Sequence, residues 1–242
     1  MIVGFGFKVA LAPFHVWTPD VYEGAPAPIT GFMAAGPKAA AFASFVRVFV
    51  LGFPLVAGAQ AAGILHETWI SLLAVLGIVT ILFGNVAAIL QNNIKRMLAY
   101  SSIAHAGYAT VGFVGAGLAK TAAERNEAIA AVAFYLFVYA ITNLGAFAIV
   151  SLLGQRNDRR ADFEDYNGIG FKAPLLSFSL SVFMLSLLGM PLTAGFIGKV
   201  LVFRPALESG SVLLVALVVV AVIGSAISAY YYLRLLVVMF FR

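Results

Sequence analysis

Long runs of apolar residues, not interrupted by regular polar positions, constrain this chain more than any other feature. The run VLLVALVVVAVIGSAIS at 212–228 is one example; over the whole chain 62% of residues are hydrophobic and 10% are charged. Soluble domains carry roughly 25% charged residues, so lipid is the solvent for most of this chain. Unpaired backbone groups cost several kcal/mol each in lipid, which permits only helices or a closed barrel. Because the runs do not alternate, we predict an all-α integral membrane protein with a single membrane domain, 1–242.

About seven stretches are long enough to cross a bilayer, since a hydrocarbon core about 30 Å thick needs about 20 apolar residues per helix. The predicted spans are 1–17, 29–52, 68–90, 97–118, 128–153, 175–203 and 210–240. Two of them are expected to be broken helices. Pro13 removes a backbone donor from the first span, and the run GMPLTAGFIGK places Pro191 among glycines in the sixth. Backbone freed at that depth has to face protein or water.

The orientation follows from the loops, because cytoplasmic loops carry an excess of lysine and arginine. The loops after spans three and five share one face, and their basic residues are Lys95, Arg96, Arg156, Arg159, Arg160 and Lys172. The opposite face offers Lys120, Arg125 and Arg204. We predict that the first face is cytoplasmic, together with a loop at 18–28 whose shape depends on Asp20 and Glu23.

Ionisable side chains inside apolar spans are costly, which makes each of them a candidate functional group. Five such groups lie within spans or near their ends: Lys8, His15, Lys38, His105 and Lys199. Lys8 precedes the break at Pro13, so it is expected near the C-terminal end of a half-helix, where carbonyls favour a cation. His15 follows two helical turns later on the same face. Burial lets a lysine exchange its proton near neutral pH, so the five groups are predicted to form a proton relay.

Hydroxyl and amide side chains recur at helical spacing in the fourth and fifth spans, where they could order a chain of waters. They are Ser101, Tyr108, Tyr135, Tyr139, Thr142 and Asn143. Structural explanations stay open beside the relay. A lysine can snorkel or hydrogen-bond the carbonyls of a broken helix, and His105 can hydrogen-bond a serine or a carbonyl. Lys95 and Arg234 are predicted to anchor at the membrane boundary, and the tyrosines at 230–232 to pack or to lie at the interface.

The residue types that are missing also exclude functions. Without cysteine, this chain holds no disulfide, thiolate-bound iron-sulfur cluster or thiolate zinc site, and no cofactor is predicted. The net charge of +5 comes from scattered basic residues, so nucleic acid is not a predicted partner. All ten acidic residues fall in loops or at span ends. Because a buried cation needs a partner, we expect the counter-charge of the lysines to come from outside these 242 residues.

Four motifs in order, covering nearly the whole chain, resemble the antiporter-like subunits of NADH:quinone oxidoreductase, respiratory complex I. They are GFKVALAPFHVWTPDVYEGAPAP, PK in the next span, NIKRMLAYSSIAHAGY and GMPLTAGFIGK. The TPDVYEGAPAP stretch is most similar to the N-type subunit, subunit 2 in mitochondria, rather than to the L and M types.

The resemblance implies a fourteen-helix antiporter-like fold that moves protons through a central row of lysines and histidines. By motif, FK and PFH give Lys8 and His15, PK gives Lys38, GFIGK gives Lys199, and SSIAHAGY gives His105. The chain departs from the family pattern because the first six helices are absent, and with them a glutamate that modulates the first lysine. We also expect a final helix of the family pattern to be missing from these 242 residues.

The function implied by the resemblance is that of a proton-translocating subunit with no redox centre, coupled to quinone reduction elsewhere in the complex. Its partners would be the other membrane subunits, including neighbouring antiporter-like subunits, and the lipid bilayer. The implied location is the bacterial inner membrane, or the organelle inner membrane in a eukaryote. Two alternatives remain: a subunit of a related cation/proton antiporter or membrane-bound hydrogenase, and a structural membrane spacer. The DVYEGAP run argues against the first, and lysines at helix breaks argue against the second.

Overall fold

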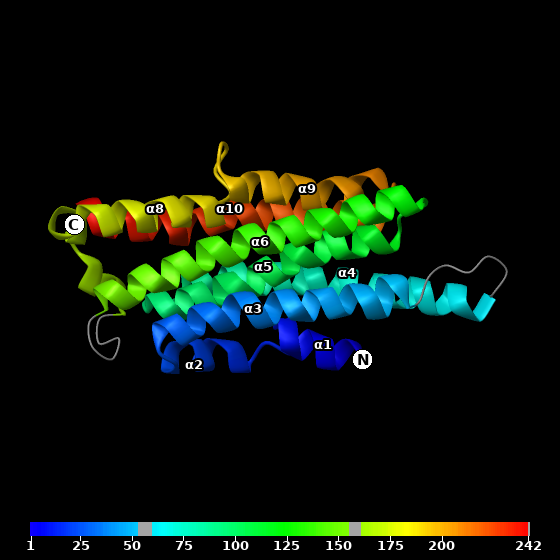
Figure 1. The fold of residues 1–242 in the computed structure, drawn as a ribbon, viewed down its shortest axis with the longest axis horizontal. Helices are drawn as coiled ribbons and strands as arrows, with labels where there is room; N and C mark the ends of the chain where they lie inside the picture. Colours follow the sequence, from blue (N-terminus) through cyan, green and yellow to red (C-terminus); the bar gives the residue numbers. More distant parts are fainter. Residues whose placement is uncertain (53–59, 155–160, 242) are drawn as a thin grey trace.

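The computed structural model describes residues 1–52, 60–154 and 161–241, which form an elongated bundle of helices lying side by side (Figure 1). The longer elements are α3 (Ala27–Phe45), continued by the π-helical η1 (Val46–Leu51), α4 (Gln60–Ile89), α5 (Ile94–Gly117), α6 (Ala122–Leu153), α8 (Pro174–Leu188), α9 (Ala194–Glu208) and α10 (Val212–Phe241). The shorter ones are α1 (Ile2–Val9), α2 (Trp17–Gly24), the 3₁₀ turn η3 (Phe163–Tyr166) and α7 (Ile169–Lys172).

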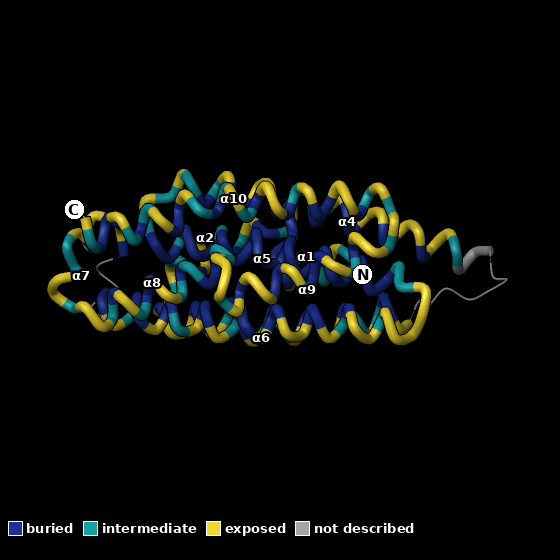
Figure 2. Tube along the Cα trace, turned by 90° about the horizontal axis from the view of Figure 1, so that it is seen from above, coloured by how far each residue is buried: buried dark blue, intermediate teal, exposed yellow. Residues whose placement is uncertain are grey.

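The outer surface of the bundle is apolar, as a lipid-facing surface must be. Exposed positions follow the outer sides of the long helices (Figure 2), and they include Val79 on α4, Phe137 on α6 and Val222 on α10. By length and composition, four helical segments are able to cross a membrane: Ala27–Leu51, Gly63–Ile89, Ala122–Leu153 and Val212–Phe241. The shorter helix Pro174–Leu188 is also apolar. The predicted all-α membrane fold is therefore confirmed in its class.

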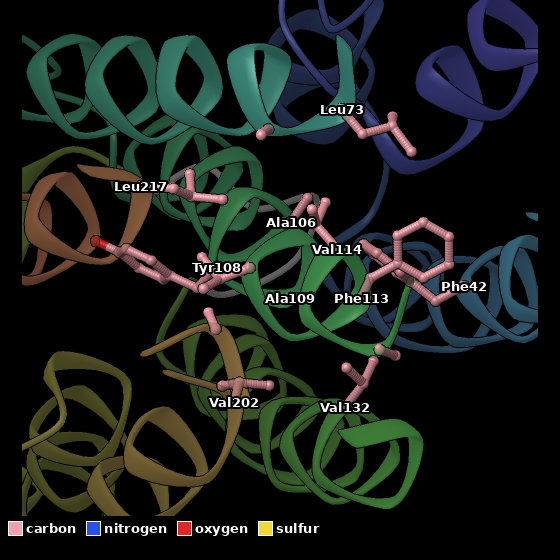
Figure 3. Close-up of a cluster of buried hydrophobic side chains, with 14 of the residues drawn as sticks. Phe42, Leu73, Ala106, Tyr108, Ala109, Phe113, Val114, Val132, Val202 and Leu217 are labelled. Carbon is pink, nitrogen blue, oxygen red and sulfur yellow. The ribbon is translucent and has the colours of Figure 1, made fainter. Parts of the chain in front are cut away.

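Helix α5 lies at the centre of the bundle, between α4, α6, α9 and α10. It is buried along almost its whole length, although it carries serines, a histidine and a tyrosine. Apolar side chains of the surrounding helices, among them Phe42, Leu73, Val202 and Leu217, enclose the half of α5 that contains Phe113 (Figure 3). Because α5 faces protein and not lipid, polar groups on it can pair with the neighbouring helices.

The first predicted span differs from the structure in its geometry. Helix α1 ends at Val9, four residues before Pro13, and Ala10 adopts a left-handed conformation with φ 63°. Residues 10–16 form turns rather than helix. Pro13 has no N–H to donate, and its ring would clash with the carbonyl of Val9 in a continued helix, so α1 cannot extend through this segment. The prediction that Lys8 and His15 lie two helical turns apart on one face is therefore wrong.

The predicted loop at 18–28 is also wrong, because helix α2 occupies Trp17–Gly24. Pro19 falls in the first turn of α2, where its missing N–H has no helical acceptor to lose. Asp20 and Glu23 lie one turn apart, and both bind the same nitrogen of Arg96 on α5, at 2.7 Å each. Lys95 donates to the carbonyl of Ala25 at 2.7 Å. These contacts with α5 hold the short helix α2 in place, and no local sequence pattern predicted them.

Two of the long helices begin well over one helical turn earlier than predicted. Helix α4 begins at Gln60 instead of 68, and α6 begins at Ala122 instead of 128. The start of α6 is set by a capping box, in which Thr121 and Glu124 bond each other's backbone N–H groups. The longer α4 carries a buried histidine that was not among the predicted candidates: His66 Nε2 lies 2.9 Å from the carbonyl oxygen of Gly117.

Anchoring contacts join the helix ends. Arg234, predicted to anchor, donates to the Gln91 carbonyl and to Asn92 Oδ1, both at 3.0 Å. At the other end of the bundle, Arg204 of α9 lies 3.4 Å from Glu127 of α6 and 2.8 Å from Glu208. The predicted cytoplasmic residues Arg156, Arg159 and Arg160 lie outside the described residues.

Candidate functional site: a buried network of lysine, histidine and hydroxyl groups

Lys38 lies on α3 and points into the interior of the bundle. Its predecessor Pro37 is inside the helix, and the Lys38 side chain is buried, with 3% of the residue exposed. The ammonium donates to the carbonyl of Ser102 at 2.7 Å and to its hydroxyl at 2.6 Å. It also lies 6.0 Å from the ring centre of Tyr139 on α6. Hydrogen bonds to a charged group contribute roughly 1.5–3 kcal/mol each, so α5 supplies the polar contacts that a buried lysine requires.

Lys199 lies on α9, immediately beyond the interruption between α8 and α9. Helix α8 ends at Leu188, where Gly189 takes up a left-handed conformation with φ 82°. The ammonium of Lys199 donates to the Leu188 carbonyl at 2.7 Å and to Ser225 Oγ of α10 at 2.8 Å. The ring of Tyr108 lies beneath it, with its centre 4.9 Å from Nζ. The contact with the Leu188 carbonyl agrees with the alternative explanation given above, in which a lysine hydrogen-bonds the carbonyls of a broken helix.

His105 lies on α5 between helices that carry the two lysines, and both ring nitrogens have hydroxyl partners. Nδ1 is 2.6 Å from the hydroxyl of Tyr135, and Nε2 is 3.2 Å from the hydroxyl of Tyr232. The hydroxyls of Tyr232 and Ser101 hydrogen-bond each other. The ring of Tyr139, which faces Lys38, is also 4.9 Å from the His105 ring, centre to centre. A neutral imidazole donates at one nitrogen and accepts at the other, so this arrangement can pass a proton.

A second branch connects α4, α5 and α10 toward Lys199. Asn85 Nδ2 donates to the Tyr108 hydroxyl at 2.9 Å, and Asn85 Oδ1 accepts from the Tyr231 hydroxyl at 3.0 Å. Tyr231 packs on Tyr232, with the ring centres 4.5 Å apart. The ring of Tyr108 leaves the apolar cluster with its hydroxyl directed away from it (Figure 3). Through these contacts the network extends from His105 to Tyr108, whose ring lies next to the Lys199 ammonium.

Tyr231 and Tyr232, which were predicted to pack or to lie at the interface, also take part in the network. Both are fully buried and hold the hydrogen bonds just described, whereas Tyr230 is 58% exposed and faces outward. A signal was available: Ser225, Ser228 and Tyr232 recur at spacings of three and four in an otherwise apolar helix, which places them on one face.

The polar stripe predicted on α6 divides in the structure. Tyr135 and Tyr139 face His105, while Thr142 bonds carbonyls of its own helix at 2.9 and 3.0 Å. Asn143 donates to the Tyr139 hydroxyl at 3.0 Å. The side chains that α6 contributes to the network are therefore the tyrosines, with Asn143 supporting one of them.

Lys8 and His15 lie apart from this network. Lys8 is in the last turn of α1 and is exposed, on the rim of an open groove of about 580 Å³ between α1 and α3. Pro37 and Ser44 line the other side of that groove. His15 is buried against Phe83, with ring centres 4.4 Å apart, and among the described residues its Nδ1 has no hydrogen-bond partner. The structure thus brings together Lys38, His105 and Lys199 only.

The counter-charge of Lys38 and Lys199 is still predicted to come from outside these 242 residues, given the exposure of the acidic residues in the described part of the chain. None of its aspartates and glutamates is buried. The lysine ammonium groups are held by carbonyls, hydroxyls and aromatic rings, which are neutral. A network of this kind tolerates the loss of a proton from a lysine better than an ion pair would, because no partner charge is left unpaired.

Known proteins with a similar sequence and fold place the chain in a family. A family of transmembrane proteins described as "NADH:quinone oxidoreductase/Mrp antiporter, TM" matches residues 1–224. NADH-quinone oxidoreductase subunit N of Trichlorobacter lovleyi is 47% identical over 242 residues, which are all of this chain and 46% of that protein. The chain therefore spans about half the length of the curated relatives that it matches.

Solved structures agree with this. A chain of respiratory complex I from Thermus thermophilus matches with 43% identity and a TM-score of 0.77, over 100% of this chain and 48% of its own. A chain of an archaeal membrane-bound sulfane sulfur reductase matches with 27% identity and a TM-score of 0.83, over 99% of this chain and 45% of its own. The chain described here belongs to the transmembrane family of NADH:quinone oxidoreductase and Mrp antiporter subunits.

Proposed function

We propose that this chain works as a proton-conducting membrane subunit of NADH:quinone oxidoreductase, corresponding to the C-terminal part of subunit N. The observation that carries the proposal is the buried network in which His105 connects the surroundings of Lys38 and Lys199 through tyrosine and serine hydroxyls. The similarity to subunit N over the whole chain supports the same function. The bilayer concerned is the bacterial inner membrane, and the partners are the other membrane subunits of complex I.

In this proposal, a proton moves between Lys38 and Lys199 by way of His105. Lys38 gives its proton to the hydroxyls and waters around Ser102, and His105 accepts at one nitrogen while it releases at the other. The hydroxyl at one nitrogen, that of Tyr135 or Tyr232, gives its proton to the imidazole as it takes up another. The hydroxyl at the opposite nitrogen takes the released proton and passes its own onward, and Lys199 is the next group that can hold it. The chain contributes no redox chemistry, so quinone reduction elsewhere in the complex has to drive the changes in charge that move the proton.

The alternatives are less well supported. A chain of the Mrp complex of Dietzia has the same fold with a TM-score of 0.80, but at 20% identity the likeness extends to the fold alone. The 47% identity to subunit N favours complex I over a cation/proton antiporter or a hydrogenase. A structural spacer has no need for two buried lysines joined by a histidine. The decisive test is the ratio of protons pumped to quinone reduced when each lysine is replaced by methionine.

We further propose that the chain crosses the membrane seven times, with α1–α2 and α8–α9 as the two broken spans. A single cysteine at Lys172 should then react with an impermeant maleimide from the cytoplasmic side, and one at Lys120 only from the opposite side. Both positions are exposed, and helix α7, which carries Lys172, lies at the opposite end of the bundle from the connection between α5 and α6, which carries Lys120 (Figures 1 and 2). The same labelling of a cysteine at Arg159 tests a second residue that the sequence predicts to be cytoplasmic. Labelling of Lys120 and Lys172 cysteines from one side would contradict the seven-span arrangement.

Lys8 and His15 complete the proposed relay, although they lie outside the network of the described residues. The proposal rests on the exposure of Lys8 in the groove beside Pro37, where a lysine facing lipid would be costly. We expect a carboxylate from outside this sequence to approach the Lys8 ammonium, directly or through one or two waters. A structure of the whole assembly checks this. Apolar side chains alone around that ammonium, without a water path, would contradict it.

A further inference from the structure

Ser225 of α10 makes an unusual pair of contacts beside Lys199. Its hydroxyl oxygen is 2.8 Å from the Lys199 nitrogen, and the same hydroxyl donates to the Leu188 carbonyl at 3.1 Å. Lys199 donates to that carbonyl as well, at 2.7 Å. Three groups from α8, α9 and α10 therefore close a small ring of hydrogen bonds at the point where α8 ends.

The ring depends on space left by Gly189. A Cβ at this position would lie 3.0 Å from Lys199 Cδ and 3.2 Å from Nζ, and φ is +82°, a conformation that favours glycine. An open cavity of about 620 Å³ adjoins the ring, lined by Gly189, Lys199 and Ser225 among others. The Ser225 hydroxyl thus has room to rotate, while the lysine side chain is confined by the turn.

The two oxygen partners of Lys199 differ in what they can offer. The Leu188 carbonyl only accepts, so it suits an ammonium and cannot satisfy the lone pair of a neutral amine. The Ser225 hydroxyl accepts from the ammonium and, after rotation, donates to the amine. We propose that Ser225 is a positioning residue for Lys199, which holds this side chain at the helix break in both protonation states. This inference rests on the proposed function, because it presumes that Lys199 exchanges a proton.

Ser225 is not the only group near the lysine, and the others bear on the expected pH dependence. The titratable side chains that face Lys199 or join its network are Tyr108 and His105 from α5, Tyr135 from α6, and Tyr231 and Tyr232 from α10. Residues of α8 offer it the Leu188 carbonyl. The aromatic groups remain when Ser225 is replaced, so a change in the pH profile reports the hydroxyl.

The test uses Ser225→Ala in the complete complex in membrane vesicles, with protons pumped per quinone reduced measured against pH. A charged donor forms the stronger hydrogen bond, so loss of the hydroxyl disfavours the protonated lysine more than the neutral one. We expect pumping to fall several-fold at neutral pH, and the alkaline limb of the profile to move about one pH unit toward acid. Ser225→Thr, which keeps the hydroxyl, should restore both.

The control is Ser181→Ala on α8, whose hydroxyl, within the described part of the chain, bonds the carbonyl of Ser177 in its own helix, at 2.8 Å. It should leave the ratio and the profile unchanged. In Lys199→Met, adding Ser225→Ala should cause no further loss. If Lys199→Met lowers the pumping ratio but Ser225→Ala leaves the pH profile unchanged, this inference alone is overturned. If Lys199→Met leaves the pumping ratio unchanged, the proposed role of Lys199 itself is overturned. If Ser225→Ala fails to assemble, Ser225→Val removes the hydroxyl in a side chain of the same shape as that of Ser225→Thr, and a wild-type profile in the valine variant would equally overturn the inference.

Discussion

Lys38→Met and Lys199→Met should each lower the ratio of protons pumped to quinone reduced by about tenfold or more, while the assembled complex remains in the membrane. Methionine fills nearly the same volume and removes the cost of a buried charge, so the fold is expected to survive. What is lost is the group that holds the transferred proton, and proton transfer by a positioned side chain is worth roughly 10²–10⁴ in rate. The measurement is acidification by vesicles that contain the complete complex.

Arginine at the two lysines and phenylalanine at His105 make this prediction more specific. Arginine at either position keeps the positive charge but does not release a proton, so it should preserve assembly without restoring pumping. His105→Phe keeps a ring and removes both nitrogens, and it should fail in the same way. Lys172→Met is the matched control, because Lys172 is exposed on the short helix α7. If the three single variants Lys8→Met, Lys38→Met and Lys199→Met all pumped protons normally, the chain would instead be a structural spacer.

Gly195→Ala should destabilise the bundle more than any other single methyl addition at a described glycine. A Cβ at Gly195 would lie 1.8 Å from the carbonyl oxygen of Ser186 and 2.8 Å from its carbon. These are backbone atoms of α8 and cannot rotate away, so α8 and α9 would have to separate. Overpacking usually costs about 1–3 kcal/mol, and we expect this substitution to reach or exceed that range. The amount of assembled subunit in membranes, and its resistance to heat in detergent, measure the loss.

The control for Gly195 is Gly63→Ala on α4, where an added Cβ meets nothing within 4 Å. Alanine is favoured over glycine in a helix by up to about 1 kcal/mol, so this variant should be neutral or slightly stabilising. Equal stability of the two variants would mean that α8 and α9 do not pack as closely as the structure has them.

Much of the architecture was determined by local sequence. Apolar runs far too long for a soluble helix required lipid, and lipid in turn required helices, because backbone groups have no other partners there. The same argument identified Lys38, His105 and Lys199 as candidates. Burying an ionisable side chain in lipid costs free energy, so such a residue in an apolar run can be recognised without knowledge of its neighbours.

The tertiary structure decided which of these residues meet. Nothing local indicated that Ser102 would receive Lys38, that Ser225 would close the ring at Lys199, or that Tyr232 would reach His105, because these partners are 64, 26 and 127 residues apart. Helix α2 was missed for the same reason, as its carboxylates are held by Arg96 on a distant helix. A hydrogen bond between helices depends on how the helices pack, so the sequence alone could identify the candidate residues but not their partners.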